Sequence, residues 1–140
     1  MATAFPQIQP HGGVLVNPMI VDGQIWGGAA QGIGTALDEE MRFDAQGQPL
    51  ASTLSDYLLP GPTEVPDIRI LHMETPSPYT EFGQKGVGEG GAIGPAAAIA
   101  NAVNDALHAF GVELCEIPIT PPRIVAALSK VVPRMPTNRA

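Results

Sequence analysis

The chain has 140 residues, of which 44% are hydrophobic and 15% are charged, and its formal net charge at pH 7 is -7. This length and composition suit one soluble, globular domain, and the shortage of basic residues argues against a surface that binds nucleic acid or an anionic membrane. The single cysteine excludes an internal disulfide framework and a cysteine-based zinc site, and the three scattered histidines offer no metal-ligand spacing.

The first element is expected to be a helix from Pro18 to Met41, after an irregular lead-in over residues 1–13. Asn17 can cap this helix, and Pro18 suits its first turn. Apolar residues recur at intervals of three and four, as in a helix that packs on one side; they are Trp26, Ala29, Ala30, Ile33, Leu37 and Met41. Glycines cost about 1 kcal/mol each relative to alanine inside a helix, so the close approach of another backbone or of a ligand should compensate for four of them; these are Gly27, Gly28, Gly32 and Gly34.

A short hairpin is predicted for residues 42–50, with its turn at Gln46 and Gly47. Alternating residues from Asp67 to Glu74 predict a strand. Proline-containing loops lie before and after this strand. The organisation is therefore that of an α/β (α+β) domain, with helices packed on a small mixed sheet.

Two further helices are predicted near the end of the chain. The first runs from Pro95 to Phe110 and ends at Gly111. A short strand over residues 112–117 follows, and Thr120 and Pro121 then begin a last helix that continues to Leu128. No internal repeat and no second domain is evident, and residues 131–140 are expected to form a tail.

The run from Gln84 to Gly91 is the strongest candidate for a site, because it places one acid, Glu89, among four glycines. One interpretation is a plain connecting loop in which the carboxylate favours the dipole of the next helix. A second is a dinucleotide fingerprint, but the proline-containing residues 76–81 do not make the strand that this motif requires. A third is a loop whose backbone N–H groups hold an anionic or metal-bound cofactor, with Glu89 as a general base in a poorly solvated pocket.

Three segments favour the third interpretation: residues 17–25, residues 30–40 and the sequence Lys85-Gly86-Val87-Gly88-Glu89. In order and spacing they resemble the C-terminal end of the molybdopterin-binding large subunit in the xanthine dehydrogenase, aldehyde oxidase and carbon monoxide dehydrogenase family. The intervening segments 56–60, 72–78 and 101–106 also look like bacterial members of that family. The resemblance covers residues 14–128, so residues 14–130 are identified as the C-terminal part of a molybdopterin-binding domain.

The resemblance implies a molybdenum hydroxylase, an oxidoreductase that hydroxylates an aldehyde or an N-heterocycle carbon with oxygen from water. It implies that Glu89 is the general base, that Gln24 hydrogen-bonds the pterin, and that the backbone of Gly86, Val87 and Gly88 lines the cofactor pocket. Lys85 would lie beside the substrate channel. Gln31 would be a further cofactor contact, with packing of the helix as the alternative. No side chain of the chain is expected to bind the metal.

The cofactor implied is molybdenum-molybdopterin, in the cytosine dinucleotide form used by bacteria. FAD and 2Fe-2S centres would belong to partner domains or subunits. Because such large subunits have several hundred residues, we expect a C-terminal fragment or split subunit that is inactive until the remainder of the large subunit completes the site. The alternative is a truncated, non-catalytic remnant that folds or self-associates without cofactor. Because the sequence shows no membrane span and no signal peptide, the cytoplasm is the expected location.

Overall fold

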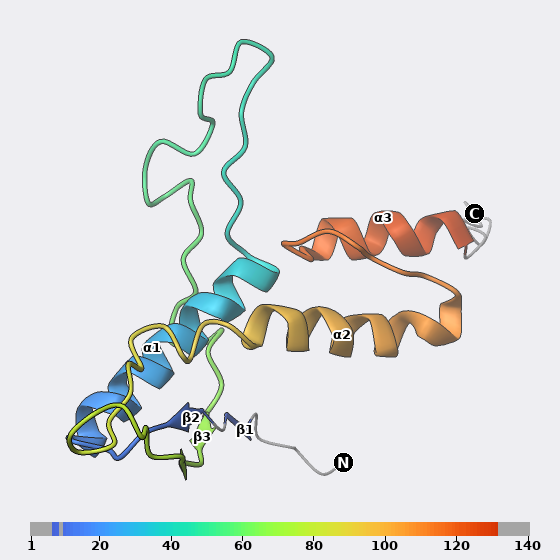
Figure 1. The fold of residues 1–140 in the computed structure, drawn as a ribbon. Coiled ribbons are helices and arrows are strands. Elements are labelled where there is room, and N and C mark those ends of the chain that lie inside the picture. The colour runs from blue at the N-terminus through green and yellow to red at the C-terminus, as the bar shows by residue number, and fades with distance from the viewer. Residues whose placement is uncertain (1–6, 9, 132–140) are drawn as a thin grey trace, which may run out of the picture.

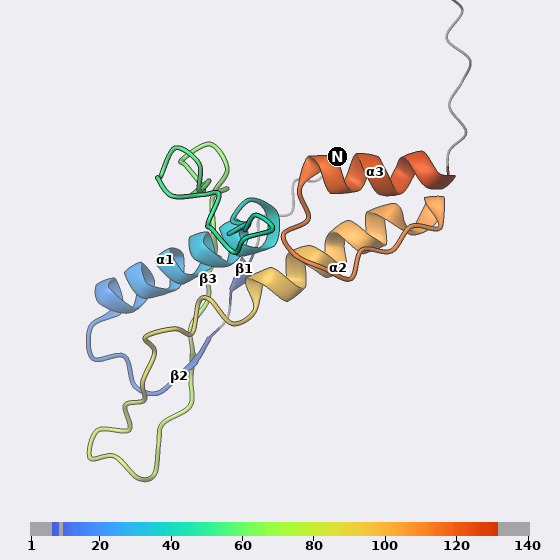
Figure 2. The same ribbon diagram turned by 90° about the horizontal axis from the view of Figure 1, so that it is seen from above.

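The computed structural model describes Gln7, Ile8 and residues 10–131. These residues form three α-helices, one 3-10 helix and four two-residue strands: β1 (Gln7–Ile8), β2 (His11–Gly12), α1 (Pro18–Leu37), β3 (Arg69–Ile70), β4 (Met73–Glu74), α2 (Pro95–Leu107), η1 (His108–Phe110) and α3 (Pro121–Val131). Helices α1 and α2 pack together near the start of α2, and a long arm, residues 42–66, projects from the end of α1 (Figure 1). The view from above shows α3 beside α2 (Figure 2). The α/β class is confirmed, whereas residues 132–140 of the predicted tail and the start of the predicted lead-in lie outside the described residues.

Helix α1 begins as predicted, because the Asn17 side chain accepts a hydrogen bond from the Ile20 N–H at 3.3 Å. The predicted end at Met41 is wrong, since the helix stops at Leu37. The Asp38 and Glu39 N–H groups both donate to the Gly34 carbonyl, at 2.9 and 2.8 Å, and this closes the last turn. Three consecutive acids from Asp38 onwards would oppose the negative end of the helix dipole, which disfavours a longer helix.

The buried face of α1 differs from the predicted stripe. Ala29 and Ile33 are buried as expected, but Trp26 is 50% exposed and Met41 is 47% exposed. The residues that α1 buries are Val21, Ile25, Ala29, Gly32, Ile33, Gly34 and Ala36. A Cβ on Gly28 would lie 2.8 Å from the Ala92 backbone nitrogen. The approach of another backbone, one of the two compensations expected for the helix glycines, is therefore confirmed at Gly28.

The strands come from segments that are far apart in the sequence. β1 pairs with β3 and β2 pairs with β4, and both ladders are parallel. The prediction of an irregular lead-in is therefore wrong for β1 and β2, because two-residue strands leave no alternation that a sequence could reveal. Within the predicted strand from Asp67 to Glu74, only β3 and β4 are strands, and they belong to two separate sheets. Within the described residues, antiparallel pairing occurs only as an isolated bridge between Phe43 and Pro49, so neither of the two sheets is mixed as predicted.

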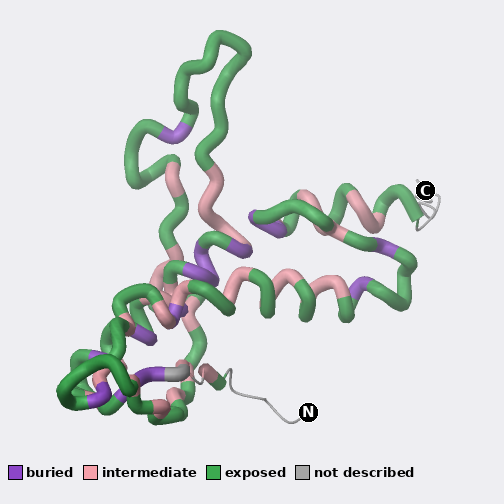
Figure 3. The backbone as a smooth tube through the Cα atoms, viewed as in Figure 1, coloured by how far each residue is buried: buried purple, intermediate pink, exposed green. Residues whose placement is uncertain are grey.

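The arm contains the predicted hairpin. The Leu50 N–H donates to the Arg42 carbonyl at 2.8 Å, and Gly47 has a φ of +82°, the left-handed conformation that favours glycine in such turns. Most of the arm is exposed, whereas many of the buried residues lie within α1 (Figure 3). Its Tyr57 hydroxyl donates to Glu39 at 2.7 Å, which attaches the arm to the end of α1.

Helix α2 and the left-handed Gly111 agree with the prediction, with the last turn in the 3-10 form as η1. The predicted strand over residues 112–117 is wrong. Instead of pairing with another strand, Leu114 pairs with the Asn104 side chain, which accepts from the Leu114 N–H at 2.8 Å and donates to its carbonyl at 3.0 Å. Helix α3 begins at Pro121 as predicted and continues to Val131, beyond Leu128.

The described residues bury few large side chains. Only Ile25 and Ile119 are large and almost fully buried, while Ile93 is 82% exposed and Phe82 is 67% exposed. The core is thus a narrow strip along α1, extended by Ile119, whose N–H donates to the Ala36 carbonyl at 2.6 Å. None of the helices described is long and apolar enough to span a membrane.

Candidate functional site

The structure brings two of the predicted site segments together. The Gln24 side-chain amide on α1 donates to the Gly88 carbonyl at 3.0 Å, although 64 residues separate them in sequence. Glu89 follows directly, so the candidate base lies beside the residue that Gln24 contacts. Both Gln24 and Glu89 are exposed. The poorly solvated surroundings expected for Glu89 are therefore not supplied by the described part of the chain.

The glycines of the loop and of the facing part of α1 differ in the space around them. A Cβ on Gly91 would lie 2.8 Å from the Ile25 Cα, so this glycine lets the loop pack directly on the backbone of α1. In contrast, a Cβ on Gly86, on Gly88 or on Gly27 would have no atom within 4 Å. Space thus remains open beside these three glycines.

The loop also offers hydrogen-bond donors. Later in the loop, the Gly90 N–H donates to the Val87 carbonyl at 3.2 Å and the Ala92 N–H donates to the Glu89 carbonyl at 3.0 Å. The N–H groups of residues 86 to 89 donate to no atom among the described residues. Consecutive free N–H groups can bind a ligand that carries hydrogen-bond acceptors or negative charge.

Lys85 lies at the start of this loop but does not point freely into a channel. Its ammonium group donates to the Thr75 hydroxyl at 2.9 Å. Thr75 in turn donates from its N–H and its hydroxyl to the Gly12 carbonyl, at 2.8 and 3.1 Å. Lys85 therefore attaches the loop to the end of β4, and its predicted place beside a substrate channel stays a prediction.

Gln31 lies on α1 seven residues after Gln24, which places it on the same face about 10 Å further along the helix. Its side chain is exposed and makes no hydrogen bond to the described residues. The alternative role in helix packing is thus not seen in this part of the chain. Its role as a cofactor contact stays a prediction.

Two cavities adjoin the loop and share Val87. The larger, of about 940 Å³, lies between α1 and α2 and is lined mostly by apolar side chains, among them Ala29, Ile33 and Ile99. The smaller, of about 220 Å³, lies between the segment after β2 and the start of the loop. No sequence motif marks the larger cavity, because its apolar residues look like ordinary core positions.

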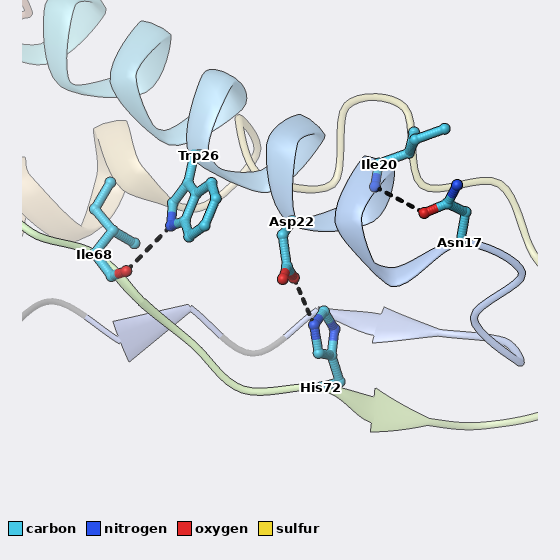
Figure 4. A network of polar contacts seen from close by, with 6 residues as sticks. All are labelled: Asn17, Ile20, Asp22, Trp26, Ile68 and His72. Atoms are coloured by element: carbon cyan, nitrogen blue, oxygen red, sulfur yellow. Dashed lines mark hydrogen bonds and ion pairs between the residues drawn. The ribbon is translucent and has the colours of Figure 1, made fainter.

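Two polar contacts of α1 were also missed by the sequence reasoning (Figure 4). His72 donates to the Asp22 carboxylate at 2.7 Å, and the Trp26 indole N–H donates to the Ile68 carbonyl at 3.2 Å. Asp22 and Trp26 are four residues apart and so lie on the same side of the helix. They hold the segment that contains β3 and β4 against α1, and no local pattern signals such long-range contacts.

A separate group of acids lies at the other end of α1. Burial raises the pKa of Asp38, and the charges of Glu64 and Glu39 raise it further. Arg123 on α3 pairs with Glu40 at 2.6 Å. Asp38 is fourteen residues beyond Gln24, about 20 Å along the helix, so these acids are not part of the loop site. Across the described residues, no three His, Cys, Asp or Glu side chains are grouped so that they could hold a metal ion.

Comparison with known proteins gives a consistent result. Residues 11–66 match the molybdopterin cofactor-binding domain family. The chain is 46% identical over 120 residues to the nicotine 6-hydroxylase large subunit of Paenarthrobacter nicotinovorans, and 41% identical over 118 residues to the carbon monoxide dehydrogenase large chain of Hydrogenophaga pseudoflava. These alignments cover 86% and 84% of the chain but only 15% of each relative. In the crystal structure of quinoline 2-oxidoreductase from Pseudomonas putida 86, the matching part has a TM-score of 0.85 and 48% identity, and covers 89% of this chain and 16% of that one.

Proposed function

Because the chain belongs to the xanthine dehydrogenase, aldehyde oxidase and carbon monoxide dehydrogenase family of molybdopterin-binding large subunits, we propose that it forms one wall of the cofactor site of a molybdenum hydroxylase. The chain spans 15% of the length of the relatives it matches, so the other walls would come from further polypeptide. The observation that carries the proposal is the hydrogen bond from Gln24 to Gly88, which joins the exposed face of α1 to the loop that bears Glu89.

The residues present fit a pterin cofactor. A pterin edge has both hydrogen-bond donors and acceptors, and the described residues leave the Gln24 amide oxygen free to accept while the loop N–H groups are free to donate. The open space beside Gly86 and Gly88 would admit a bulky ring, because no side chain fills it. When bound, the molybdenum cofactor would supply the redox centre at which a substrate carbon is hydroxylated with oxygen from water.

Glu89 would act as the general base. Its carboxylate accepts a proton, and its backbone is held by the turn that the Ala92 N–H closes onto the Glu89 carbonyl at 3.0 Å. Gly91 fixes the same turn against Ile25. Since Glu89 is exposed here, the rest of the assembly would have to cover it, and exclusion of water would then strengthen its interactions with the reacting groups.

The finer features follow from the same proposal. The cofactor would have the cytosine dinucleotide form, and electrons would leave through 2Fe-2S and FAD centres on partner domains or subunits in the cytoplasm. Gln31 would be a second cofactor contact, and Lys85 would lie near the substrate. The chain alone would have no turnover. The competing proposal is a non-catalytic remnant that folds or self-associates without binding cofactor, and exposed apolar side chains such as Ile93 would support self-association.

The test is to purify the tagged chain from its source, identify the polypeptides bound to it, and measure molybdenum content together with oxidation of aldehydes, N-heterocycles and carbon monoxide. Glu89→Gln should leave the molybdenum content unchanged and lower turnover at least about a hundredfold, because general-base catalysis commonly contributes that much. Glu81→Gln, in the same loop region, is the matched control and should keep full turnover. Retention of activity by Glu89→Gln would refute the general-base role. A chain that carries neither molybdenum nor flavin and iron-sulfur partners would support the remnant.

A further inference from the structure

The segment from His72 to Thr75, here called the strap, contacts both sides of the candidate site. It consists of β4 and one residue on each side of it. At its first residue, the His72 ring donates from Nε2 to the Asp22 carboxylate at 2.7 Å (Figure 4). Asp22 is two residues before Gln24 on α1. One end of the strap therefore contacts the helix wall of the site, within one turn of the residue that reaches the loop.

The other end of the strap contacts the glycine loop. The Thr75 hydroxyl accepts a hydrogen bond from the Lys85 ammonium group at 2.9 Å, and Lys85 is the residue before Gly86. The strap is also attached to β2, because the Thr75 N–H and hydroxyl both donate to the Gly12 carbonyl at the end of that strand. The Val14 N–H, two residues after β2, donates to the Gly83 carbonyl at 3.1 Å and so attaches the residue before the loop to the chain that follows β2.

Each contact alone would be a modest surface interaction. The His72 and Asp22 side chains are 26% and 31% exposed, and exposed pairs of this kind contribute little to the stability of a fold. Their arrangement is more informative than their strength. The strap contacts α1 through His72 and the loop through Thr75. The hydrogen bond from Gln24 to Gly88 joins α1 to the loop directly.

We propose that His72 and Thr75 are positioning residues, which set the spacing between α1 and the start of the glycine loop and so keep Gln24 within hydrogen-bonding distance of Gly88. The inference rests on the proposed function for the claim that this pair borders the cofactor. At the very start of α1, Met19 and Ile20 are 76% and 59% exposed, so these two residues do not hold the helix against the loop. A shift of about 1 Å between the two walls would break the Gln24 contact, because hydrogen bonds weaken steeply beyond their usual distance.

The experiment measures solvent exchange of the Gln24 side-chain amide protons in the complete chain by NMR, with the signal assigned through a Gln24→Glu variant. Thr75→Val keeps the side-chain shape but removes the hydroxyl, whereas Thr75→Ser retains it. His72→Leu removes the donor to Asp22, whereas His72→Gln places an amide donor near the position of the ring nitrogen. Thr75→Val and His72→Leu should each speed exchange about fivefold, because the Gln24 amide would lose its hydrogen bond to the Gly88 carbonyl. Thr75→Ser and His72→Gln should return the exchange rate to within about twofold of that of the natural chain.

Arg123→Leu is the control, because it removes the ion pair with Glu40 at the far end of α1 and should leave Gln24 exchange unchanged. Unchanged exchange in Thr75→Val and His72→Leu would overturn the proposal, and so would an equal increase in Arg123→Leu, which would indicate a general loss of stability. If Thr75→Val does not fold, Lys85→Met removes the same contact from its exposed partner and should give the same increase.

The two proposals fail separately. The NMR measurement needs no cofactor and no turnover, so it reports only whether the strap controls the Gln24 contact. The Glu89→Gln measurement reports only whether the loop supplies a base. Faster exchange in the strap variants together with full turnover in Glu89→Gln would keep the positioning role and refute the catalytic one.

Discussion

Gly91 lies directly against the backbone of Ile25, where an added Cβ would be 2.8 Å from the Ile25 Cα and 3.0 Å from its carbonyl carbon. Both neighbouring atoms belong to the main chain of α1, which cannot move aside as the end of a flexible side chain can. This contact fixes how closely the end of the glycine loop, at Gly91, approaches α1.

Gly91→Ala should consequently destabilise the chain. The expected loss is about 1 to 3 kcal/mol in the free energy of unfolding, the usual cost of forcing extra volume into a packed contact. Urea unfolding followed by circular dichroism measures it. Gly23→Ala is the control, because Gly23 lies inside α1 and a Cβ there has no atom within 4 Å, and it should be neutral or stabilising. Equal stability of the two variants would contradict the close contact.

Asn104→Ala should also destabilise the chain, because it removes both hydrogen bonds to the Leu114 backbone. Partly buried polar groups left without partners cost about 1 to 3 kcal/mol. Asn104→Asp keeps the acceptor for the Leu114 N–H but loses the donor to its carbonyl, so its loss should be intermediate. Asn101→Ala, one turn earlier on α2 and exposed, is the control for helix propensity and should change stability little. Thermal unfolding of the three variants checks this order.

Asp38 should make stability depend on pH. Its pKa is raised from 3.8 by burial and by the Glu64 and Glu39 charges, so the folded chain holds this proton more tightly than the unfolded chain. The unfavourable contribution is absent below the unfolded pKa, develops as the pH rises through the raised pKa, and is complete above it. Asp38→Asn should therefore stabilise the chain at about pH 7, with a smaller gain at about pH 4.5, as measured by urea unfolding. A gain that grew toward acid pH would contradict this assignment.

Glu64 should behave in the opposite sense. Hydrogen bonds from the Thr63 hydroxyl and the Gly61 N–H lower its pKa from 4.5. The stability that this carboxylate contributes is present above the unfolded pKa and is lost as the pH falls through the lowered one. Glu64→Gln should remove that contribution, but it also relieves Asp38 of a neighbouring charge. In the Asp38→Asn background the relief disappears, so Glu64→Gln should be more destabilising there than in the natural chain when unfolding is compared at about pH 7.

The isolated chain should self-associate, because large apolar side chains such as Phe82 and Ile93 remain exposed. Sedimentation equilibrium over a range of concentrations should show dimers or larger species. The double substitution of Phe82 and Ile93 by serine should shift the distribution toward monomer. Tyr79→Ser, which removes a 94% exposed side chain with a polar end, is the control and should have a smaller effect. A chain that is monomeric at every concentration would refute the prediction.

Much of the local structure could be predicted from the sequence. Asn17 and Pro18 start α1, Pro121 starts α3, Gly111 ends the helical segment after α2, and Gly47 turns the hairpin. These features depend on the backbone preferences of one or two residues and their nearest neighbours, which are present in any context. The resemblance of several ordered motifs likewise identified the family and selected Gln24, Glu89 and the loop between Gly86 and Gly88.

The sequence alone determined where helices and turns begin, which family the chain belongs to and which residues are candidates for its site. Only the tertiary structure decided that β1 and β2 pair with β3 and β4, that Leu114 pairs with the Asn104 side chain instead of a strand, and that Gly91 packs while Gly88 stays open. Local preferences are carried by neighbouring residues, and a sequence displays them directly. Long-range contacts depend on groups tens of residues away, and their free energy exists only when the folded backbone brings both partners together.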